Sequence, residues 1–265
     1  MELNDLLEEV KTLAVETGRF LRTERKSFRR DKVEKKAAHD YVSYVDKTSE
    51  QLIVKRLREL LPEAGFVTEE GSAFFSGEEY CWLVDPLDGT TNFIHDNAPY
   101  CVSIALRKGN KMQLGVVYEC CREELYWATK DSPAYLNGQE IHVSDLSVLD
   151  QAFIELGFPY DAERFRPFIN GIIASLYGHV GGLRLLGSAA AELCYLAAGR
   201  FEARIEGLLG PWDIAAGSLI LQRAGGRVSD FNGGDTYHSG HEVLASNGKL
   251  HDELLKIIRL HLQKK

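Results

Sequence analysis

A short apolar run that ends in an acidic turn is the stretch that most constrains this chain. Residues 82–84 are apolar and β-prone, and an Asp-Pro-Leu-Asp-Gly sequence follows them directly. Pro86 cannot donate to a strand ladder, so we expect the strand to end where the carboxylate of Asp85 emerges. Pro86 also biases Asp85 away from the helical region, which places Asp85 and Asp88 at the two ends of a tight turn. The sequence therefore predicts two convergent carboxylates at the mouth of a buried strand.

The residues after this turn suit an anion beside the acids. Gly89 lets the backbone approach a ligand closely, and the amides of Gly89, Thr90 and Thr91 would open a short helix. Such amides form a cradle for an anion, while the carboxylates attract a divalent cation. The combination predicts phosphate together with magnesium.

An ordinary turn is the competing interpretation, because Asp, Pro and Gly are the commonest turn formers. Two further acidic stretches argue for function. Asp213 follows Pro211 and Trp212 at the first turn of an apolar helix, and the pair Glu69 and Glu70 follows a short strand. Three acidic strand or helix ends in one chain indicate a shared site.

These motifs resemble the inositol monophosphatase family in order and spacing across nearly the whole chain: Glu69-Glu70, residues 85–91, and residues 211–226. The resemblance implies an α+β / α/β fold, a layered α-β-α-β-α sandwich of the sugar-phosphatase type. It also implies a magnesium-dependent, lithium-inhibited phosphomonoesterase that is usually a homodimer.

The resemblance also assigns roles to individual residues. It implies two or three Mg²⁺ ions, with metal ligands at Glu69, Asp85, the carbonyl of Leu87, Asp88 and Asp213. Catalytic residues would be Asp46, Thr90 and Glu70, with Asp46 pairing with the Thr90 hydroxyl to polarise a water. Substrate-binding residues would be Lys35, Asp88, Gly89, Thr90, Thr91, Ala189 and Glu206. The preference for a hard metal follows from the ligand type alone, because Mg²⁺ favours oxygen ligands and retains waters.

Two of these assignments have simpler alternatives. Asp46 could be only an acid that stabilises a helix N-terminus through the helix dipole. The charged segment 22–36 reads as a solvated loop, and its functional interpretation is an electropositive lid that carries Lys35.

The pair His238 and His241 is weak as a metal site, because the intervening Ser-Gly argues against one helix presenting both imidazoles.

The reaction type leaves alternatives open. A carboxylate nucleophile is conceivable for an acidic loop, but the i, i+3 spacing of Asp85 and Asp88 across a proline favours direct attack by water. A catalytically silent, metal-binding regulatory protein is the alternative from another class. The complete set of acids together with Asp46 and Thr90 argues against it.

The substrate is expected to be a small polyol or inositol monophosphate. Residues 91–93 resemble the inositol-phosphate branch, and the acceptor oxygens of Glu206 suit vicinal hydroxyls. Arg184, Arg204 and Lys35 could reach a second phosphate, which leaves a 3′(2′),5′-bisphosphate nucleotidase or a fructose-1,6-bisphosphatase open, since guanidinium groups in particular bind phosphate well. Phe158 stands where some family members carry a small polar residue, so the alcohol pocket is expected to be reshaped.

Composition excludes several classes of protein. A net charge of −8 over 265 residues argues against a nucleic-acid surface, which needs a basic patch. No apolar run approaches the ~18 residues of a membrane span, and the N-terminus is not a basic signal start. Five cysteines without a Cys-x-x-Cys pair are expected to be free thiols in a reducing compartment. We therefore expect a cytoplasmic enzyme acting on a small phosphate monoester.

The pattern of elements predicts two halves in one compact unit. Residues 1–146 are expected to form an α+β half, with helices at 3–24 and 48–61 on an antiparallel meander with strands at 102–106, 112–118, 124–128 and 141–143. Asn137-Gly138 predicts a hairpin turn. Residues 147–265 are expected to form an α/β half, with helices at 162–177, 188–198, 211–224 and 249–262 alternating with strands at 152–156, 183–186, 201–205, 226–229 and 243–246.

Overall fold

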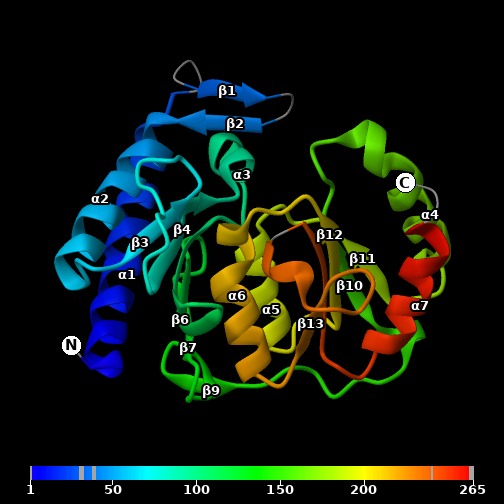
Figure 1. Ribbon diagram of the computed structural model, residues 1–265. Helices are drawn as coiled ribbons and strands as arrows, with labels where there is room; N and C mark the ends of the chain where they lie inside the picture. The colour runs from blue at the N-terminus through cyan, green and yellow to red at the C-terminus, as the bar shows by residue number, and fades with distance from the viewer. Residues whose placement is uncertain (1, 30–32, 38–39, 240, 263–265) are drawn as a thin grey trace.

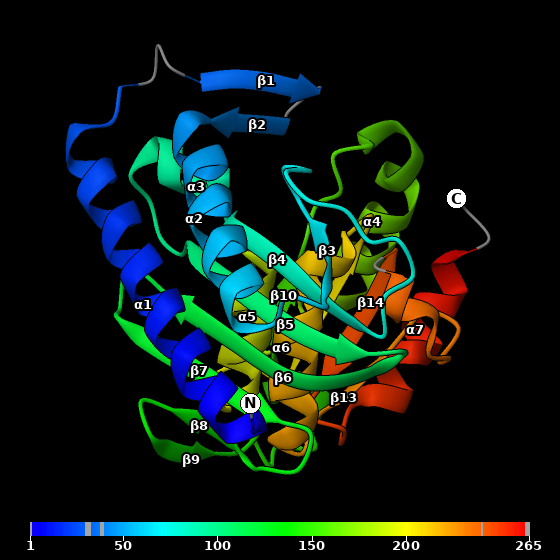
Figure 2. The same ribbon diagram turned by 60° about the vertical axis from the view of Figure 1, so that its left-hand side comes forward.

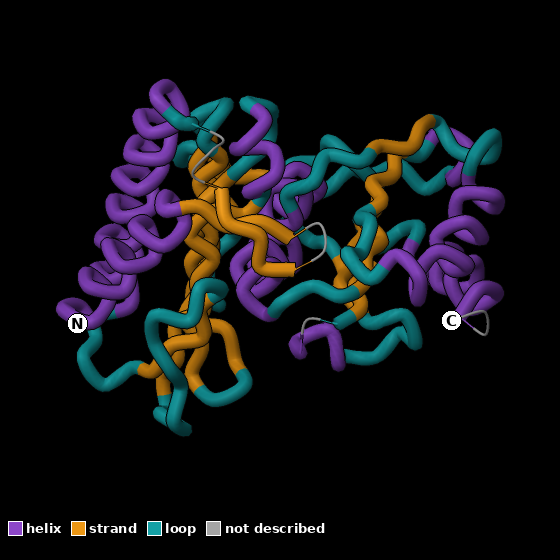
Figure 3. The backbone as a smooth tube through the Cα atoms, turned by 90° about the horizontal axis from the view of Figure 1, so that it is seen from above, coloured by secondary structure: helices purple, strands orange, loops and turns teal. Residues whose placement is uncertain are grey.

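The computed structural model describes residues 2–29, 33–37, 40–239 and 241–262. Within them, helices and sheets alternate in five layers, which Figure 1 shows from left to right and Figure 3 shows from above. Helices α1 (Leu3–Ser27) and α2 (Tyr44–Leu60) form the first layer, and α4 (Ala162–Leu176) and α7 (His251–Leu262) form the last. Two sheets lie between, separated by α5 (Ala189–Ala197) and α6 (Pro211–Arg223). The α-β-α-β-α sandwich expected from the sequence is confirmed.

The first sheet has the strand order β3-β4-β5-β6-β7-β8-β9 in the described residues. The bounds are β3 Gly65–Thr68, β4 Tyr80–Asp88, β5 Cys101–Lys108, β6 Lys111–Glu119, β7 Glu124–Thr129, β8 Ala134–Leu136 and β9 Gln139–Ile141. Its pairs are antiparallel except β3 with β4, which run parallel. The predicted turn joins β8 to β9, with Asn137 and Gly138 at φ 49° and 83°. The strand expected at 141–143 lies earlier, because this hairpin ends at Ile141.

Strand β4 carries the acidic turn, but it does not end at Asp85. The pairing of β4 with β5 resumes at Asp88 after an irregularity between Asp85 and Asp88. Pro86 therefore lies inside a bulge, where the ladder needs no donor from it. The prediction that the strand stops at Asp85 was wrong, and the bulge is what places both carboxylates at one end of the sheet.

Helix α1 continues through Ser27, so Arg22 is helical and not part of a loop. A hairpin of β1 (Val33–Ala37) and β2 (Asp40–Ser43) follows, and it lies over the short helix α3 (Thr90–His95) in Figures 1 and 2. The structure therefore corrects the expectation of a solvated loop over 22–36: residues 22–27 belong to a helix and residues 33–36 to a strand. Lys35 belongs to β1, and its side chain lies outside the described part of the structure.

The second sheet has the order β11-β10-β12-β14-β13 in the described residues. The bounds are β10 Phe153–Leu156, β11 Gly182–Arg184, β12 Ala203–Gly207, β13 Arg227–Ser229 and β14 Glu242–Ser246. β10 runs parallel to both β11 and β12, whereas β14 is antiparallel to β12 and β13. The strands expected at 183–186 and 201–205 shift by one or two residues, to Gly182–Arg184 and Ala203–Gly207.

The central helices pack closely against the first sheet because their sequences are rich in small residues. Helix α5 begins with three alanines, all buried, and α6 contains Gly217 against Leu193 of α5. On the other side, a Cβ at Gly115 of β6 would lie 2.8 Å from the carbonyl oxygen of Ala216 in α6. The two halves therefore share one core. No helix in the described residues is long and apolar enough to cross a lipid bilayer.

Candidate active site

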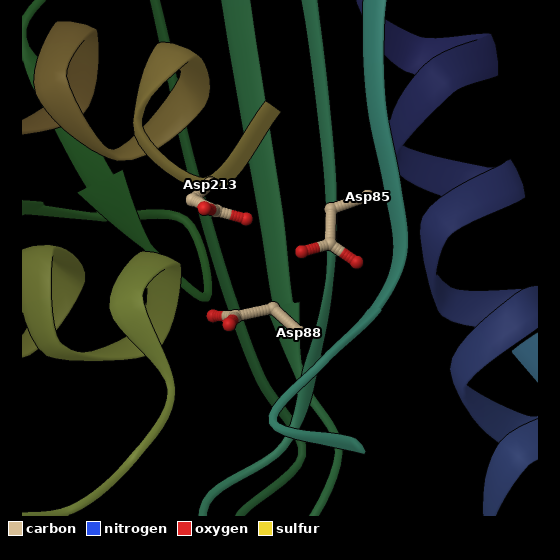
Figure 4. Close-up of side chains that lie close together, drawn as sticks. All are labelled: Asp85, Asp88 and Asp213. Atoms are coloured by element: carbon tan, nitrogen blue, oxygen red, sulfur yellow. The ribbon is translucent and has the colours of Figure 1, made fainter. Parts of the chain in front are cut away.

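Three carboxylates from distant parts of the chain converge between the central helices and the end of β4. Asp85 and Asp88 come from β4, and Asp213 comes from the first turn of α6. One oxygen from each lies within 4.8 Å of the others. Figure 4 shows the three side chains pointing toward one another. The structure thus brings together the acids that the sequence singled out.

The turn itself fixes Asp85. Its Oδ1 accepts from the amide of Leu87 at 3.0 Å, and only 1% of the residue is exposed. Burial is the main cause that raises the pKa of Asp85 well above its ordinary value, and repulsion from Glu69, Asp88 and Asp213 adds to it. Buried carboxylates that repel one another are stabilised by a shared cation, and oxygen is their only donor type. The residues present therefore fit a hard divalent metal.

Asp88 is held by the start of α5. Its Oδ1 accepts from the amide of Ala189 at 3.1 Å, and its Oδ2 accepts from the amide of Ala190 at 2.7 Å and the hydroxyl of Ser188 at 2.6 Å. Ser188 is the N-cap of α5, but its side chain does not cap the helix. Its hydroxyl donates to Asp88 instead, which joins the two halves of the chain at the acid cluster.

Asp213 is positioned by the local sequence at the start of α6. Pro211 is the first helical residue, and Oδ2 of Asp213 accepts from the amide of Gly210 at 2.6 Å. Burial raises the pKa of Asp213 well above its ordinary value, with repulsion from Asp88 as the next cause. Of its neighbours, Trp212 lines the cleft, while Ile214 packs into the core between the sheets.

Thr90 lies between Asp46 and the carbonyl of Leu87. Its Oγ1 is 3.0 Å from Oδ1 of Asp46 and 3.0 Å from the oxygen of Leu87. The other oxygen of Asp46 accepts from the amide and hydroxyl of Ser43, which caps α2. Both interpretations of Asp46 therefore hold in its geometry: it is a helix-capping acid and a partner of Thr90. Burial raises the pKa of Asp46.

Gly89 makes the turn into α3 geometrically allowed. Its φ is 91°, a left-handed conformation, and a Cβ there would lie 2.8 Å from the carbonyl oxygen of Pro99. Helix α3 begins at Thr90, as predicted, and Thr91 is exposed at the cleft. The amides of its first turn have no acceptor within the helix.

The two residues of the Glu69-Glu70 pair lie in different places: only Glu69 is at the cleft. Glu69 lines the cleft and its carboxyl lies against Asp85, although it is outside the group of three converging acids. Glu70 does not line the cleft, and its amide donates to Glu50 at 2.7 Å. The catalytic role expected for Glu70 stays a prediction. Glu50, which sequence reasoning missed, also accepts from the hydroxyl of Thr68 and the amide of Ser72, so it holds the segment that carries Glu69.

Glu206 lies on β12 at the cleft, next to Arg204 and Glu192. We predicted no structural role for either of these two residues from the sequence. Arg204 donates to Glu206 and, at 2.6 Å, to Glu192 of α5. The pKa of Glu206 is raised to about 7, since burial outweighs the opposing effect of Arg204. The available signal was the one charge of the otherwise apolar α5, Glu192, together with an arginine and a glutamate two residues apart in the buried strand β12.

The cleft around these groups has a volume of about 520 Å³. Its lining contains the acids, Gly89 to Asn92, Ala189, Arg204 and Glu206, and its mouth carries the exposed side chains Phe158, Tyr160, Leu185 and Leu208. Phe158 thus lines the cleft, and its expected effect on the alcohol pocket stays a prediction. Arg184 is exposed, stacks on Phe153 and does not line the cleft.

Other candidate groups lie outside this cleft. His238 stacks on Tyr237, and the histidine pair forms no cluster of metal-binding side chains in the described residues. The cysteines have no disulfide: four are buried and Cys121 is exposed. The expectation of free thiols is confirmed.

Comparison with known proteins decides the family. A profile of the inositol monophosphatase family matches residues 2–263. The chain belongs to this family. A fructose-1,6-bisphosphatase/inositol-1-monophosphatase from Aquifex aeolicus is 36% identical over 261 residues, which is 98% of each chain. A Nus factor SuhB from Pseudomonas aeruginosa is 39% identical over 235 residues, which is 87% of each chain.

Solved structures of inositol monophosphatase family proteins have the same fold. The extragenic suppressor protein suhB from Bartonella henselae has a TM-score of 0.91 at 31% identity, covering 96% of this chain and 98% of its own. An IMPase from Thermotoga maritima has a TM-score of 0.90 at 31% identity, covering 98% and 99%. This family member is therefore a phosphomonoesterase hydrolase. Metal dependence is a property of the family, and the acid cluster described above is consistent with it.

Proposed function

We propose that this phosphatase is a magnesium-dependent enzyme that hydrolyses a small polyol monophosphate of inositol type by direct attack of water. The observation that carries the proposal is the convergence of Asp85, Asp88 and Asp213 within 4.8 Å at a cleft that also contains Thr90 and Glu206. Oxygen donors from several elements are what Mg²⁺ selects.

The acids would hold two or three Mg²⁺ ions. Asp85, between Glu69 and the other two acids, suits a bridging position; Glu69 and the carbonyl of Leu87 would complete one side, and Asp88 with Asp213 the other. When bound, the ions neutralise the phosphoryl oxygens and lower the pKa of water. The expected substrate contacts at the amides of Gly89 and Thr91 face the same cleft, whereas the amide of Ala189 already donates to Asp88.

Thr90 and Asp46 would orient the attacking water. A hydroxyl has one proton, so Thr90 donates either to Asp46 or to Leu87 at any moment. With the Leu87 carbonyl engaged by a cation, the hydroxyl would donate to Asp46 and leave its lone pairs for a water proton. The buried Asp46 is a suitable acceptor because Ser43 fixes its other oxygen. No residue needs to carry the phosphoryl group in this scheme.

The polyol assignment is supported by the cleft's charges. Three carboxyl groups, Glu155, Glu192 and Glu206, surround the single guanidinium of Arg204. That set offers no net positive charge to a second phosphate. Arg184, the other arginine that favoured a bisphosphate, does not line the cleft. Among the residues that the structure describes, the cleft therefore offers a second phosphate no excess of positive charge; the side chain of Lys35 lies outside them.

The test is a substrate panel at fixed Mg²⁺ with released phosphate measured. We expect inositol 1-phosphate to be hydrolysed with a higher kcat/KM than fructose 1,6-bisphosphate or adenosine 3′,5′-bisphosphate. A preference of ~100-fold for either bisphosphate, about 2.7 kcal/mol of transition-state binding, would refute the polyol assignment and leave the metal mechanism standing.

Lithium gives a separate test of the metal arrangement. We expect Li⁺ to replace the ion held by Asp88 and Asp213 and to trap product phosphate. Inhibition should then deepen as the substrate concentration rises. Inhibition that substrate relieves would contradict this arrangement.

A second candidate function comes from the relatives that carry the name Nus factor, one of them 39% identical to this chain. A metal-binding regulatory protein without turnover would keep the fold and the acids. The same panel separates the two candidates. Absence of phosphate release from all substrates by folded protein loaded with Mg²⁺ would favour the regulatory role.

A further inference from the structure

A buried arginine lies beneath the cleft and links two carboxylates. Arg204 stands on β12, and only 1% of its side chain is exposed. Its Nε donates to Glu192 at 2.6 Å, and its Nη2 donates to Glu206. A guanidinium is planar and its donors form a fixed fork, so two bound carboxylates determine its orientation.

Glu192 anchors this arrangement to the loop before α5. Its Oε2 accepts from Arg204, while its Oε1 accepts from the amide of Gly187 at 2.7 Å. Glu192 is as buried as Arg204, with 1% of its side chain exposed. The arginine is therefore held by Glu192 through its Nε, and its Nη2 is left for Glu206.

Arg204 in turn restricts Glu206. The bond from Nη2 goes to Oε2 of Glu206, and no other residue in the described part of the chain donates a hydrogen bond to that carboxylate. Glu206 lines the cleft, and 14% of its side chain is exposed. Its Oε1 is thus the oxygen left to accept from a hydroxyl of a bound molecule.

The backbone at Gly157 lies directly against the carboxylate of Glu206. A Cβ at Gly157 would lie 1.9 Å from Cδ of Glu206, which is far inside van der Waals contact. The amide of Gly157 donates to the carbonyl of Ile205 at 2.9 Å, so this backbone is fixed to β12. Glu206 is therefore confined between a guanidinium and a backbone segment without a side chain.

Arg204 also lies against an acid that it does not bind. Glu155 is its register partner on β10, and both carboxyl oxygens of Glu155 lack a hydrogen-bond partner. Burial raises the pKa of Glu155 well above its ordinary value. The hydrogen bonds of Arg204 thus go to Glu192 and Glu206 and not to Glu155.

We propose that Arg204 is a positioning residue for substrate selectivity: it binds Glu206 by one oxygen and so directs the other toward a hydroxyl of a polyol phosphate. The inference rests on the proposed function and extends it to a residue that does not itself touch the substrate. It predicts that Arg204 matters for phosphate esters with a polyol leaving group and not for esters without hydroxyls.

The experiment compares inositol 1-phosphate with p-nitrophenyl phosphate, which has no hydroxyl for Glu206. For Arg204→Met and for Glu206→Gln, we expect kcat/KM for inositol 1-phosphate to fall by at least ~10-fold, mainly through KM, as for a lost hydrogen bond to a charged group. With p-nitrophenyl phosphate, kcat/KM should stay within ~3-fold of the wild type, because the metal-binding acids are untouched. The double variant should be no worse than Glu206→Gln alone, since both changes remove the same contact.

Arg204→Met leaves Glu192 unpaired and buried, so its folding has to be checked by thermal unfolding. Two variants keep the test independent of that risk. Gly157→Ala displaces Glu206 and retains the Arg204–Glu192 pair, so it should reproduce the selective loss. Arg204→Lys retains the charge without the fork and should lie between the wild type and Glu206→Gln. Arg227→Met is the matched control, an exposed arginine of the same sheet paired with Asp252, and should change neither substrate.

Equal losses with both substrates in the folded Arg204 variants would overturn the inference and indicate a general structural role. Selective loss in Glu206→Gln but not in Arg204→Lys or Arg204→Met would also overturn it. If the wild-type protein releases phosphate from neither substrate in Mg²⁺, the proposed function fails instead.

Discussion

Substitution of Asp85 or Asp213 by asparagine tests the role of the charge of each side chain separately from the role of its shape. Asparagine has almost the same shape as aspartate but lacks the negative charge that a cation needs. We expect Asp85→Asn and Asp213→Asn each to lower kcat/KM for phosphate release by at least ~10²-fold, a loss of about 3 kcal/mol of transition-state stabilisation. Steady-state kinetics at fixed Mg²⁺ measures this, and near-wild-type turnover by either variant would contradict the four-acid site.

The control for these variants must be an acid without a structural role. Asp145 is suitable, because its side chain is fully exposed and forms a loose pair with Lys249 at 3.8 Å. Asp230, which reads as an ordinary turn acid in the sequence, is unsuitable. It is buried, and its carboxylate accepts from the amides of Asn232, Gly234 and Thr236. Asp145→Asn should leave both activity and unfolding unchanged.

Thr90 is expected to act in the chemical step more than in binding. Thr90→Ala removes the hydroxyl that lies 3.0 Å from Asp46, so kcat should fall strongly while KM changes little. Thr90→Ser retains the hydroxyl and should restore most of the activity. Pre-steady-state and steady-state phosphate release distinguish these effects. Detection of a phosphorylated Asp85 or Asp88 during turnover would show a carboxylate nucleophile and refute the water mechanism.

At the scale of elements, helix α7 is anchored by its first residue. The imidazole of His251 is buried between Ser229 of β13 and Ser246 of β14, at 2.8 Å from each hydroxyl. Ser229 donates its own proton to the carbonyl of Asp230, so it must accept from Nε2–H, while Nδ1 accepts from Ser246. The arrangement requires a neutral ring.

Burial lowers the pKa of His251 to about 4, and the nearby Arg227 contributes to the shift. The unfolded chain therefore takes up a proton at a higher pH than the folded one, and stability is lost as the pH falls from about 6.5 to about 4. The loss attributable to His251 is up to about 3 kcal/mol. Urea unfolding at several pH values should show a flatter profile in this window for His251→Gln. His142→Gln, at an exposed histidine, should retain the wild-type slope.

At the scale of the whole molecule, we propose that residues 1–146 and 147–265 unfold as one unit. Helices α5 and α6 come from the second stretch, yet they cover the inner face of the first sheet. Gly115→Ala would force a Cβ to 2.8 Å from the Ala216 carbonyl and should destabilise the protein by about 1–3 kcal/mol. Lys111→Ala, at an exposed position of the same strand, is the control.

Calorimetry measures this cooperativity. A single transition in the wild type, shifted as a whole by Gly115→Ala, is the expected result. Two separate transitions, of which the variant moves only one, would show that the halves fold independently. We also propose that the chain forms a homodimer, which light scattering of the full-length protein tests.

The sequence by itself determined the local features of this protein. Proline and glycine specified the turn between Asp85 and Gly89, the Asn-Gly pair specified the β8–β9 hairpin, and Pro211 fixed the start of α6. Each depends on the backbone preferences of a few adjacent residues, which is why sequence alone was sufficient. The pattern of elements likewise predicted both central helices, and the resemblance to the family implied the layered fold.

Only the tertiary structure decided which groups meet. The bulge that carries β4 on to Asp88 and the loop that brings Ser188 to the same carboxylate both depend on pairing between segments far apart in the chain. The fork of Arg204 between Glu192 and Glu206 has the same origin, because it joins a helix to a strand across the core. A charged residue in a buried, mostly apolar helix or strand needs a partner of opposite charge. Which partner it finds is set by long-range packing, and that is not encoded in any short stretch of sequence.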